Sequence, residues 1–70
     1  MDSRAALARR YHRDAYKAGE TAVQCRAARD QLIRQLRRED PGTWTYAALA
    51  EAVGCSPELV AYIVKNEPEG

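Results

Sequence analysis

The chain has 70 residues, of which 46% are hydrophobic, and a formal net charge of +1. This length fits one domain, residues 1–70, whose core is too small for strong stability alone, so we expect a homodimer. No stretch has the composition of a membrane span or an export signal, so we expect a cytoplasmic protein without membrane contact.

The two cysteines, Cys25 and Cys55, lack the spacing of a zinc site or of a redox pair. We expect two reduced thiols, with a disulfide between them as the alternative. Neither a metal nor any other cofactor is predicted. No nucleophile stands beside a possible base, and no carboxylates are placed as a facing pair, so we do not expect an enzyme.

The charge is unevenly distributed along the chain. Residues 1–38 contain ten Arg or Lys against four acids, a net of +6, whereas residues 39–70 contain one Lys against six acids, a net of −5. A basic segment of this kind suits a polyanion such as DNA, or an acidic protein surface. A solvated helix face is the alternative for each cluster of arginines.

The first predicted helix begins at a cap, Asp2 or Ser3, and runs to about Ala18. Ala, Leu and Arg dominate this segment, and Gly19 is a natural C-terminal stop. We expect residues 1–19 to form an N-terminal helical arm. A single long helix that continues through Gly19 is the less favoured alternative, because an internal glycine costs about 1 kcal/mol relative to alanine.

Two faces of this helix are distinguishable in the sequence. Leu7, Tyr11 and Ala15 form a thin apolar stripe, suited to packing on the core or on a second subunit. His12 has no Cys or second His nearby, so we expect a surface residue rather than a metal ligand. Another face carries a basic row that would either lie along a phosphate backbone or be solvated: Arg9, Arg13 and Lys17.

The second predicted helix begins near Ala22, because Thr21 and Gln24 have the spacing of a capping box. Apolar residues then recur at steps of three and four, which predicts one buried side. The positions on this side are Ala22, Cys25, Ala28 or Arg29, Leu32, Ile33 and Leu36. The sequence Glu-Asp-Pro-Gly at residues 39–42 ends the helix and predicts a turn.

The third and fourth predicted helices have well-marked ends. Thr45 is a good N-cap for the third helix, and Gly54 can take a left-handed conformation at its end. Ser56 caps the fourth helix, and Pro57 occupies its first position, where a missing N–H costs nothing. We expect this helix to continue to Lys65 or Asn66.

Residues 46–65, YAALAEAVGCSPELVAYIVK, carry a more specific pattern. This segment resembles the helix-turn-helix of phage repressors and Cro-type proteins, and also region 4 of sigma factors. The matched positions are small Ala50, Gly54 at the turn, and the inward residues Leu49, Val53, Val60 and Ile63. The resemblance implies an all-α fold with a tri-helical helix-turn-helix core at residues 21–66, an additional N-terminal helix at residues 1–19 and a tail at residues 67–70.

What the resemblance implies for function is that the last helix enters the major groove of DNA. The candidates for reading base edges are Ser56, Pro57, Glu58, Ala61, Tyr62 and Lys65. These residues are less basic than those of most recognition helices, so affinity has to come from contacts to the DNA backbone. The candidates for that role are Arg26, Arg29, Arg34, Arg37, Arg38 and Thr45.

The sequence therefore predicts a small, phage-like, dimeric transcriptional regulator that binds double-stranded DNA. The alternative is a helical protein-interaction module, or adapter, that uses the helix-turn-helix face to bind a protein partner.

Overall fold

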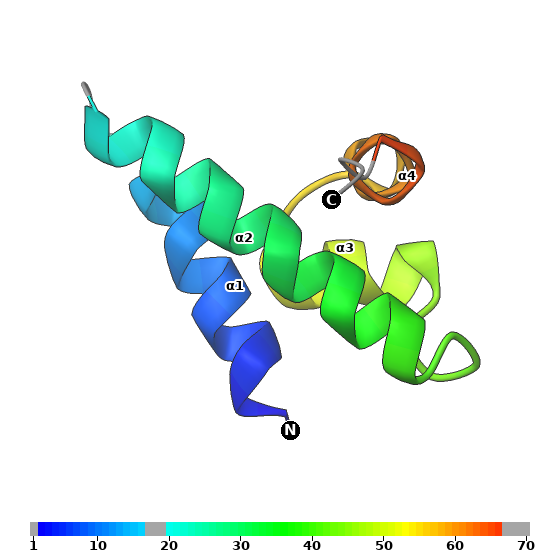
Figure 1. Cartoon of the computed structure of the whole chain (residues 1–70). Coiled ribbons are helices and arrows are strands. Elements are labelled where there is room, and N and C mark those ends of the chain that lie inside the picture. Colours follow the sequence, from blue (N-terminus) through cyan, green and yellow to red (C-terminus); the bar gives the residue numbers. More distant parts are fainter. Residues whose placement is uncertain (1, 17–19, 67–70) are drawn as a thin grey trace.

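The computed structural model of the chain describes residues 2–16 and 20–66, which contain four helices and no strand (Figure 1). The helices are α1 (Ser3–Asp14), α2 (Glu20–Glu39), α3 (Tyr46–Val53) and α4 (Pro57–Lys65). The expected all-helical fold of four helices is confirmed. The predictions that concern Lys17, Gly19, the side chain of Thr21 and the tail at residues 67–70 lie outside the described residues.

The ends of α1 and α2 agree with the sequence in part. Asp2 caps α1, because its Oδ1 accepts a hydrogen bond from the backbone N–H of Arg4 at 2.9 Å. The helix ends at Asp14, four residues before the predicted end at Ala18. α2 begins at Glu20 instead of Ala22 and ends at Glu39, as the Pro-Gly turn predicts. The long-helix alternative is therefore wrong.

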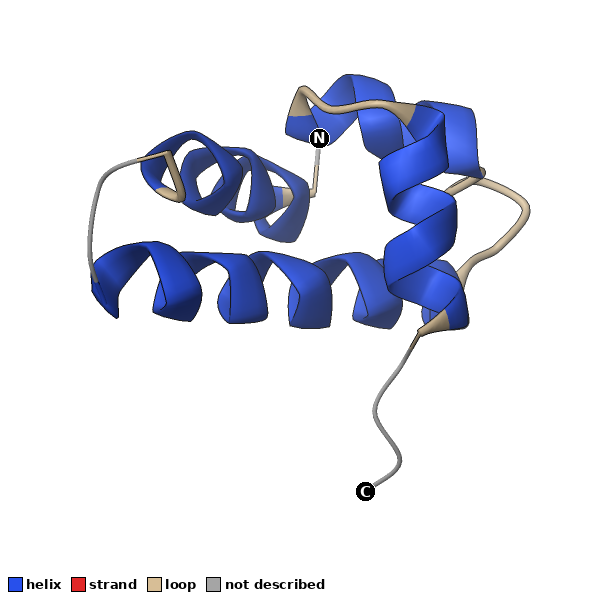
Figure 2. Ribbon diagram, turned by 90° about the horizontal axis from the view of Figure 1, so that it is seen from above, coloured by secondary structure: helices blue, strands red, loops and turns tan. Residues whose placement is uncertain are grey.

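α1 and α2 run antiparallel and side by side (Figure 2). Arg4 near the start of α1 forms an ion pair with Glu39 at the end of α2, with 2.7 Å between Nη1 and Oε2. Arg4 also pairs with Asp2, whose pKa is lowered to about 2 by the hydrogen bonds from Arg4. The ion pair between Arg4 and Glu39 joins the two helices at one end of the helix pair.

The buried face of α1 differs from the predicted stripe. It consists of Ala5, Ala8, His12 and Ala15, whereas Leu7 is 38% exposed. Three of these four residues are alanines, which allow a close approach of α1 to its neighbours but give little hydrophobic signal in a sequence. Ala5 and Ala8 belong to the main core, so α1 contributes to that core together with the other helices.

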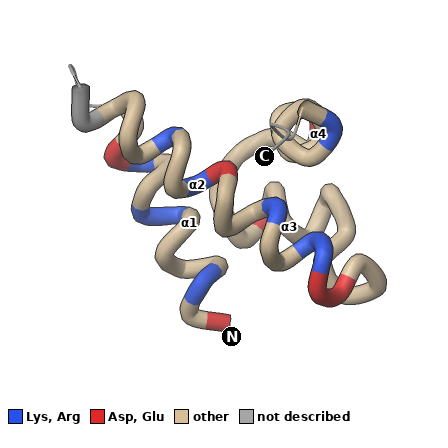
Figure 3. The backbone as a smooth tube through the Cα atoms, in the orientation of Figure 1, with Lys and Arg blue, Asp and Glu red and all other residues tan. Residues whose placement is uncertain are grey.

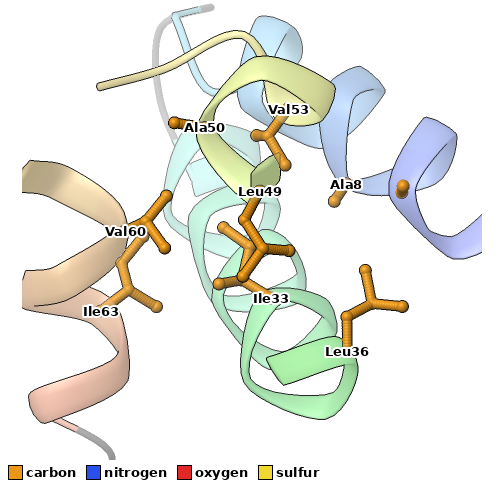
Figure 4. Close-up of a cluster of buried hydrophobic side chains, with 9 residues drawn as sticks. Ala8, Ile33, Leu36, Leu49, Ala50, Val53, Val60 and Ile63 are labelled. Atoms are coloured by element: carbon orange, nitrogen blue, oxygen red, sulfur yellow. The ribbon is translucent and has the colours of Figure 1, made fainter. Parts of the chain in front are cut away.

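The centre of the core is formed by α2, α3 and α4 (Figure 4). Its largest fully buried side chains are Ile33, Leu36, Leu49, Val53, Val60 and Ile63. The four inward residues predicted for residues 46–65 are all among them, and Ala50 is buried as well. The prediction of these inward positions is confirmed.

The joint between α3 and α4 has the predicted local structure. The Oγ1 of Thr45 accepts a hydrogen bond from the N–H of Ala48, and the Oγ of Ser56 accepts one from Leu59, each at 3.1 Å. Gly54 has a φ of 88°, and its N–H donates to the carbonyl of Ala50 at 2.8 Å. Both helices therefore begin and end where their capping residues predict.

No single helix in residues 2–16 and 20–66 is long and apolar enough to cross a membrane, whereas α3 and α4 reach that length and composition only as a pair bent by 112°.

Replacing Gly54 by Val is expected to lower the free energy of unfolding by about 1–2 kcal/mol, because an L side chain is strained at this positive φ. No atom lies within 4 Å of the position that a Cβ would take, so the cost is one of backbone conformation and not of a clash. Urea unfolding measures it. Gly42→Val is the control, since Gly42 does not have a positive φ; equal losses in both variants would contradict this explanation.

Candidate nucleic-acid interface

Two arginines of α2 bind carbonyl groups of the protein itself. The Nε of Arg34 donates to the carbonyl of Ile63 at 3.0 Å, and its Nη2 donates to the carbonyl of Asn66 at 3.3 Å. The Nη1 of Arg37 donates to the carbonyls of Pro41 and Trp44 at 3.0 and 3.2 Å. Arg34 thus holds the end of α4, and Arg37 holds the loop that leads into α3.

A third arginine of α2, Arg29, is buried against α1. It is 7% exposed, and its Nη1 lies 2.8 Å from the Nδ1 of His12, while its Nε donates to the Oδ1 of Asp30 at 2.9 Å. A guanidinium has no acceptor, so the Nδ1 of His12 must accept the hydrogen bond. The imidazole is therefore neutral, with its proton on Nε2.

The sequence-based expectation that His12 lies on the surface is wrong. His12 is 8% exposed. The physical reason is its register: four residues after Ala8 and three before Ala15, it shares their buried side of α1. Burial lowers the pKa of His12, the positive charge of Arg29 lowers it further, and Asp30 opposes this shift in part.

Three of the exposed cations of α1 and α2 lie around one aromatic side chain, Tyr16. Arg9 and Arg13 stand one turn apart on α1, and Arg26 lies on α2. Arg9 and Arg26 have no hydrogen bond or ion pair with another described residue, and Arg13 has a single pair with Asp14 at 3.8 Å. We call the group formed by Arg9, Arg13, Tyr16 and Arg26 the Tyr16 surface.

Two neighbouring hollows bring these residues together. One has a volume of about 310 Å³ and is lined by Arg9, His12, Arg13, Tyr16, Val53 and Gly54. The other has about 260 Å³ and is lined by His12, Ala15, Tyr16, Arg26, Arg29 and Leu59. His12 and Tyr16 line both hollows, so the exposed arginines of two helices border one continuous surface. Figure 3 shows Lys and Arg along α1 and α2 and none on α3.

Tyr16 was not singled out from the sequence, although a signal was present. It is 81% exposed and lies two residues after the end of α1, which carries the basic row. An aromatic side chain among arginines is a feature of surfaces that bind nucleic acid. The approach of Arg26 to Tyr16 had no such signal. It results from the antiparallel packing of α1 and α2, which sequence spacing alone does not determine.

The residues predicted to read DNA bases lie on α4 and its N-cap, and α4 borders the Tyr16 surface at Leu59, which lines the second hollow. Ser56, Pro57, Glu58, Tyr62 and Lys65 are exposed, and Ala61 is half-buried. Of the predicted backbone contacts, Arg26 and Arg38 are exposed, Thr45 caps α3, and Arg29, Arg34 and Arg37 bind groups within the protein. That any of these residues contacts nucleic acid stays a prediction.

Replacing Arg37 by Met is expected to lower the free energy of unfolding by about 1–3 kcal/mol, because two carbonyls lose their donor and the guanidinium no longer lies over the Tyr46 ring, 4.7 Å from its centroid. Arg26→Met is the control and should change it by less than about 0.5 kcal/mol. Urea unfolding followed by circular dichroism measures both. Equal effects would contradict the internal role of Arg37.

The lowered pKa of His12 predicts a pH dependence of folding. The unfolded chain binds a proton at His12 near its ordinary pKa of 6.5, and the folded chain binds it only at lower pH. The stability is therefore full above this value and falls as the pH decreases toward the folded pKa. Urea unfolding at about pH 7.5 and about pH 5.5 measures the loss.

His12→Gln is the matched control for this pH dependence, because its amide oxygen can accept the hydrogen bond from Arg29 and the side chain does not titrate. The loss of stability between the two pH values should be smaller in this variant than in the parent protein. The same loss in both proteins would show that other groups cause it.

The comparisons with known proteins give one match. Residues 4–70 match the model of a family described as Mitochondrial ribosomal protein subunit L20. No curated protein and no solved structure matches the chain. The match includes all four helices and the complete Tyr16 surface.

This match contradicts the resemblance to phage repressors, Cro-type proteins and region 4 of sigma factors. The expected transcriptional regulator, with double-stranded DNA as its ligand and a cytoplasmic location, is therefore wrong, and the adapter alternative is not supported. The physical reason is that the N-cap, the left-handed glycine and the N1 proline of residues 46–65 specify how two helices are joined, and proteins of different function share such joints.

The expected homodimer is also contradicted. Of the stripe that was predicted to pack on the core or on a second subunit, Ala15 is buried and Tyr11 is half-buried within the chain, whereas Leu7 is 38% exposed. α1 itself contacts both α2 and α3. The family model matches residues 4–70, which begin in the first turn of α1. The chain therefore belongs to the mitochondrial ribosomal protein subunit L20 family.

Proposed function

We propose that this protein is a small, non-enzymatic component of a mitochondrial ribosome and that it binds ribosomal RNA through the Tyr16 surface. Membership of the family supports the ribosomal role and a location in the mitochondrial matrix. The observation that carries the RNA contact is the presence of exposed arginines without strong internal partners around an exposed tyrosine.

The chemistry of the Tyr16 surface suits RNA in two respects. Exposed guanidinium groups attract phosphates, and each phosphate contact releases condensed counterions. An exposed aromatic ring offers a stacking platform to bases, and unpaired bases in loops and bulges are the parts of RNA that proteins recognise most often. Arg9 and Arg13, one turn apart on α1, can contact successive phosphates while Tyr16 meets a base.

The distribution of charge favours an approach of RNA from the side of α1 and α2. The described residues of α3 and α4 contribute two acids, Glu51 and Glu58, against one cation, Lys65. The arginines of α2 that hold α4 and the loop before α3 are engaged with carbonyl groups. The Tyr16 surface is therefore the region with the largest number of cations that are available to a ligand.

The role of α2, α3 and α4 in this proposal is that of a scaffold. We propose that they form a tri-helical unit with a connection of the helix-turn-helix kind and that α1 is added to it. The 112° bend between α3 and α4 and the left-handed Gly54 support this description. This unit contributes Arg26 to the Tyr16 surface and fixes α1 and α2 in the arrangement that forms it.

The test is binding of the full chain to mitochondrial ribosomal RNA at salt concentrations from about 50 to about 200 mM, measured by fluorescence anisotropy. Arg9→Gln should weaken binding and reduce the slope of log affinity against log salt by about 0.7–0.9, as expected for one lost phosphate contact. Lys65→Gln removes an exposed cation from α4 and is the matched control. It should leave the slope unchanged.

Two outcomes would contradict the proposed function. One is a parent protein without affinity for this RNA at low salt. The other is an equal reduction of the slope in Arg9→Gln and Lys65→Gln, because it would mean that the contact is not localised to the Tyr16 surface.

A further inference from the structure

Building on the proposed RNA-binding function, we propose that the hollow between α1 and the end of α3 holds one unpaired RNA base, stacked on Tyr16 and hydrogen-bonded by the Nε2–H of His12. The hollow is the one of about 310 Å³ described above. Its volume falls at the lower end of the range for small-ligand sites, about 300 Å³ and more.

His12 carries an N–H group that is available to a ligand. Its Nδ1 accepts from Arg29, which leaves the proton on Nε2. The Nε2–H has no hydrogen-bond partner among the described residues. None of the buried side-chain polar atoms in the described residues lacks a partner, so Nε2 is accessible to solvent. His12 is only 8% exposed, so its side chain reaches the surface at this nitrogen, and the residue lines both hollows at the Tyr16 surface.

Arg29 fixes this donor in place. A free imidazole alternates between two tautomers, so either of its nitrogens can carry the proton. The guanidinium of Arg29 does not accept a hydrogen bond, and burial together with its charge keeps the ring neutral. The Nε2–H is therefore permanently a donor, held on a ring that packs between two helices.

The remaining lining of the hollow is basic and apolar. Arg9 and Arg13 add further donors, Val53 adds an apolar wall, and no carboxylate of the described residues lines the hollow. Such a lining suits a flat group with hydrogen-bond acceptors on its edge and a phosphate on either side. The bases of RNA have this form, since each carries ring-nitrogen or carbonyl acceptors on its edge.

Tyr16 presents an exposed ring beside His12. Its ring meets His12 edge-on, with 5.5 Å between the ring centroids and 81° between the ring planes, and 81% of the residue remains exposed. Only an unpaired base can reach such a ring with its whole face, because the bases of a duplex are stacked on one another. The occupant is thus a nucleotide of a loop, a bulge or a single strand.

The experiment compares a single-stranded RNA of about ten nucleotides with the same RNA annealed to its complement, using anisotropy and the full chain. The parent protein should bind the single strand more tightly than the duplex. Tyr16→Ala should weaken binding to the single strand by about 5- to 150-fold, the range for one stacked base, and leave binding to the duplex unchanged. Tyr16→Phe keeps the aromatic face and should restore the affinity.

Tyr62→Ala is the matched control, because Tyr62 is 66% exposed on α4 and lies outside the hollow. It should bind both RNAs as the parent does. Equal affinity of the parent for both RNAs, or no loss in Tyr16→Ala, would overturn the base site while RNA binding itself stands. A parent that binds neither RNA would overturn the proposed function together with this site.

Discussion

A guanidinium buried between two helices has to be neutralised and hydrogen-bonded, and Arg29 meets this requirement with His12 and Asp30. Removing one partner of such a buried charge costs about 3–5 kcal/mol in other proteins, so the contact constrains both helices strongly. It brings α1 against α2, keeps the imidazole neutral, and directs its remaining N–H outward. The arrangement of the Tyr16 surface depends on this single contact.

The arginines of this chain are alike in composition but differ in what they do. Arg29, Arg34 and Arg37 each donate to groups of the protein, and all three project from α2. Arg9 and Arg26 have no such partners among the residues described. The positive charge of residues 1–38 is therefore larger than the charge that is available to a ligand, because several of these arginines stabilise the packing of α3 and α4 on α2.

The sequence predicted α3 and α4 well because each of their ends has a residue suited to one conformation, such as Thr45, Gly54 and Pro57. It predicted α1 poorly. Alanines give little hydrophobic signal, so the buried face that includes His12 could not be distinguished from a solvated one. The surface around Tyr16 needs residues of two helices, and its formation depends on tertiary packing. The predicted function was wrong because the connection between two helices was interpreted as a ligand-binding motif.

The separation of charge between the two halves of the fold also affects how the molecule meets a polyanion. With a formal net charge of only +1, the protein experiences little attraction at distances beyond the Debye length, about 8 Å at physiological salt. The basic α1–α2 side and the acidic α3–α4 side nevertheless form an electric dipole, which exerts a torque near a phosphate backbone. The protein is therefore expected to turn during the last ångströms of an encounter, so that productive collisions depend on orientation more than on long-range steering.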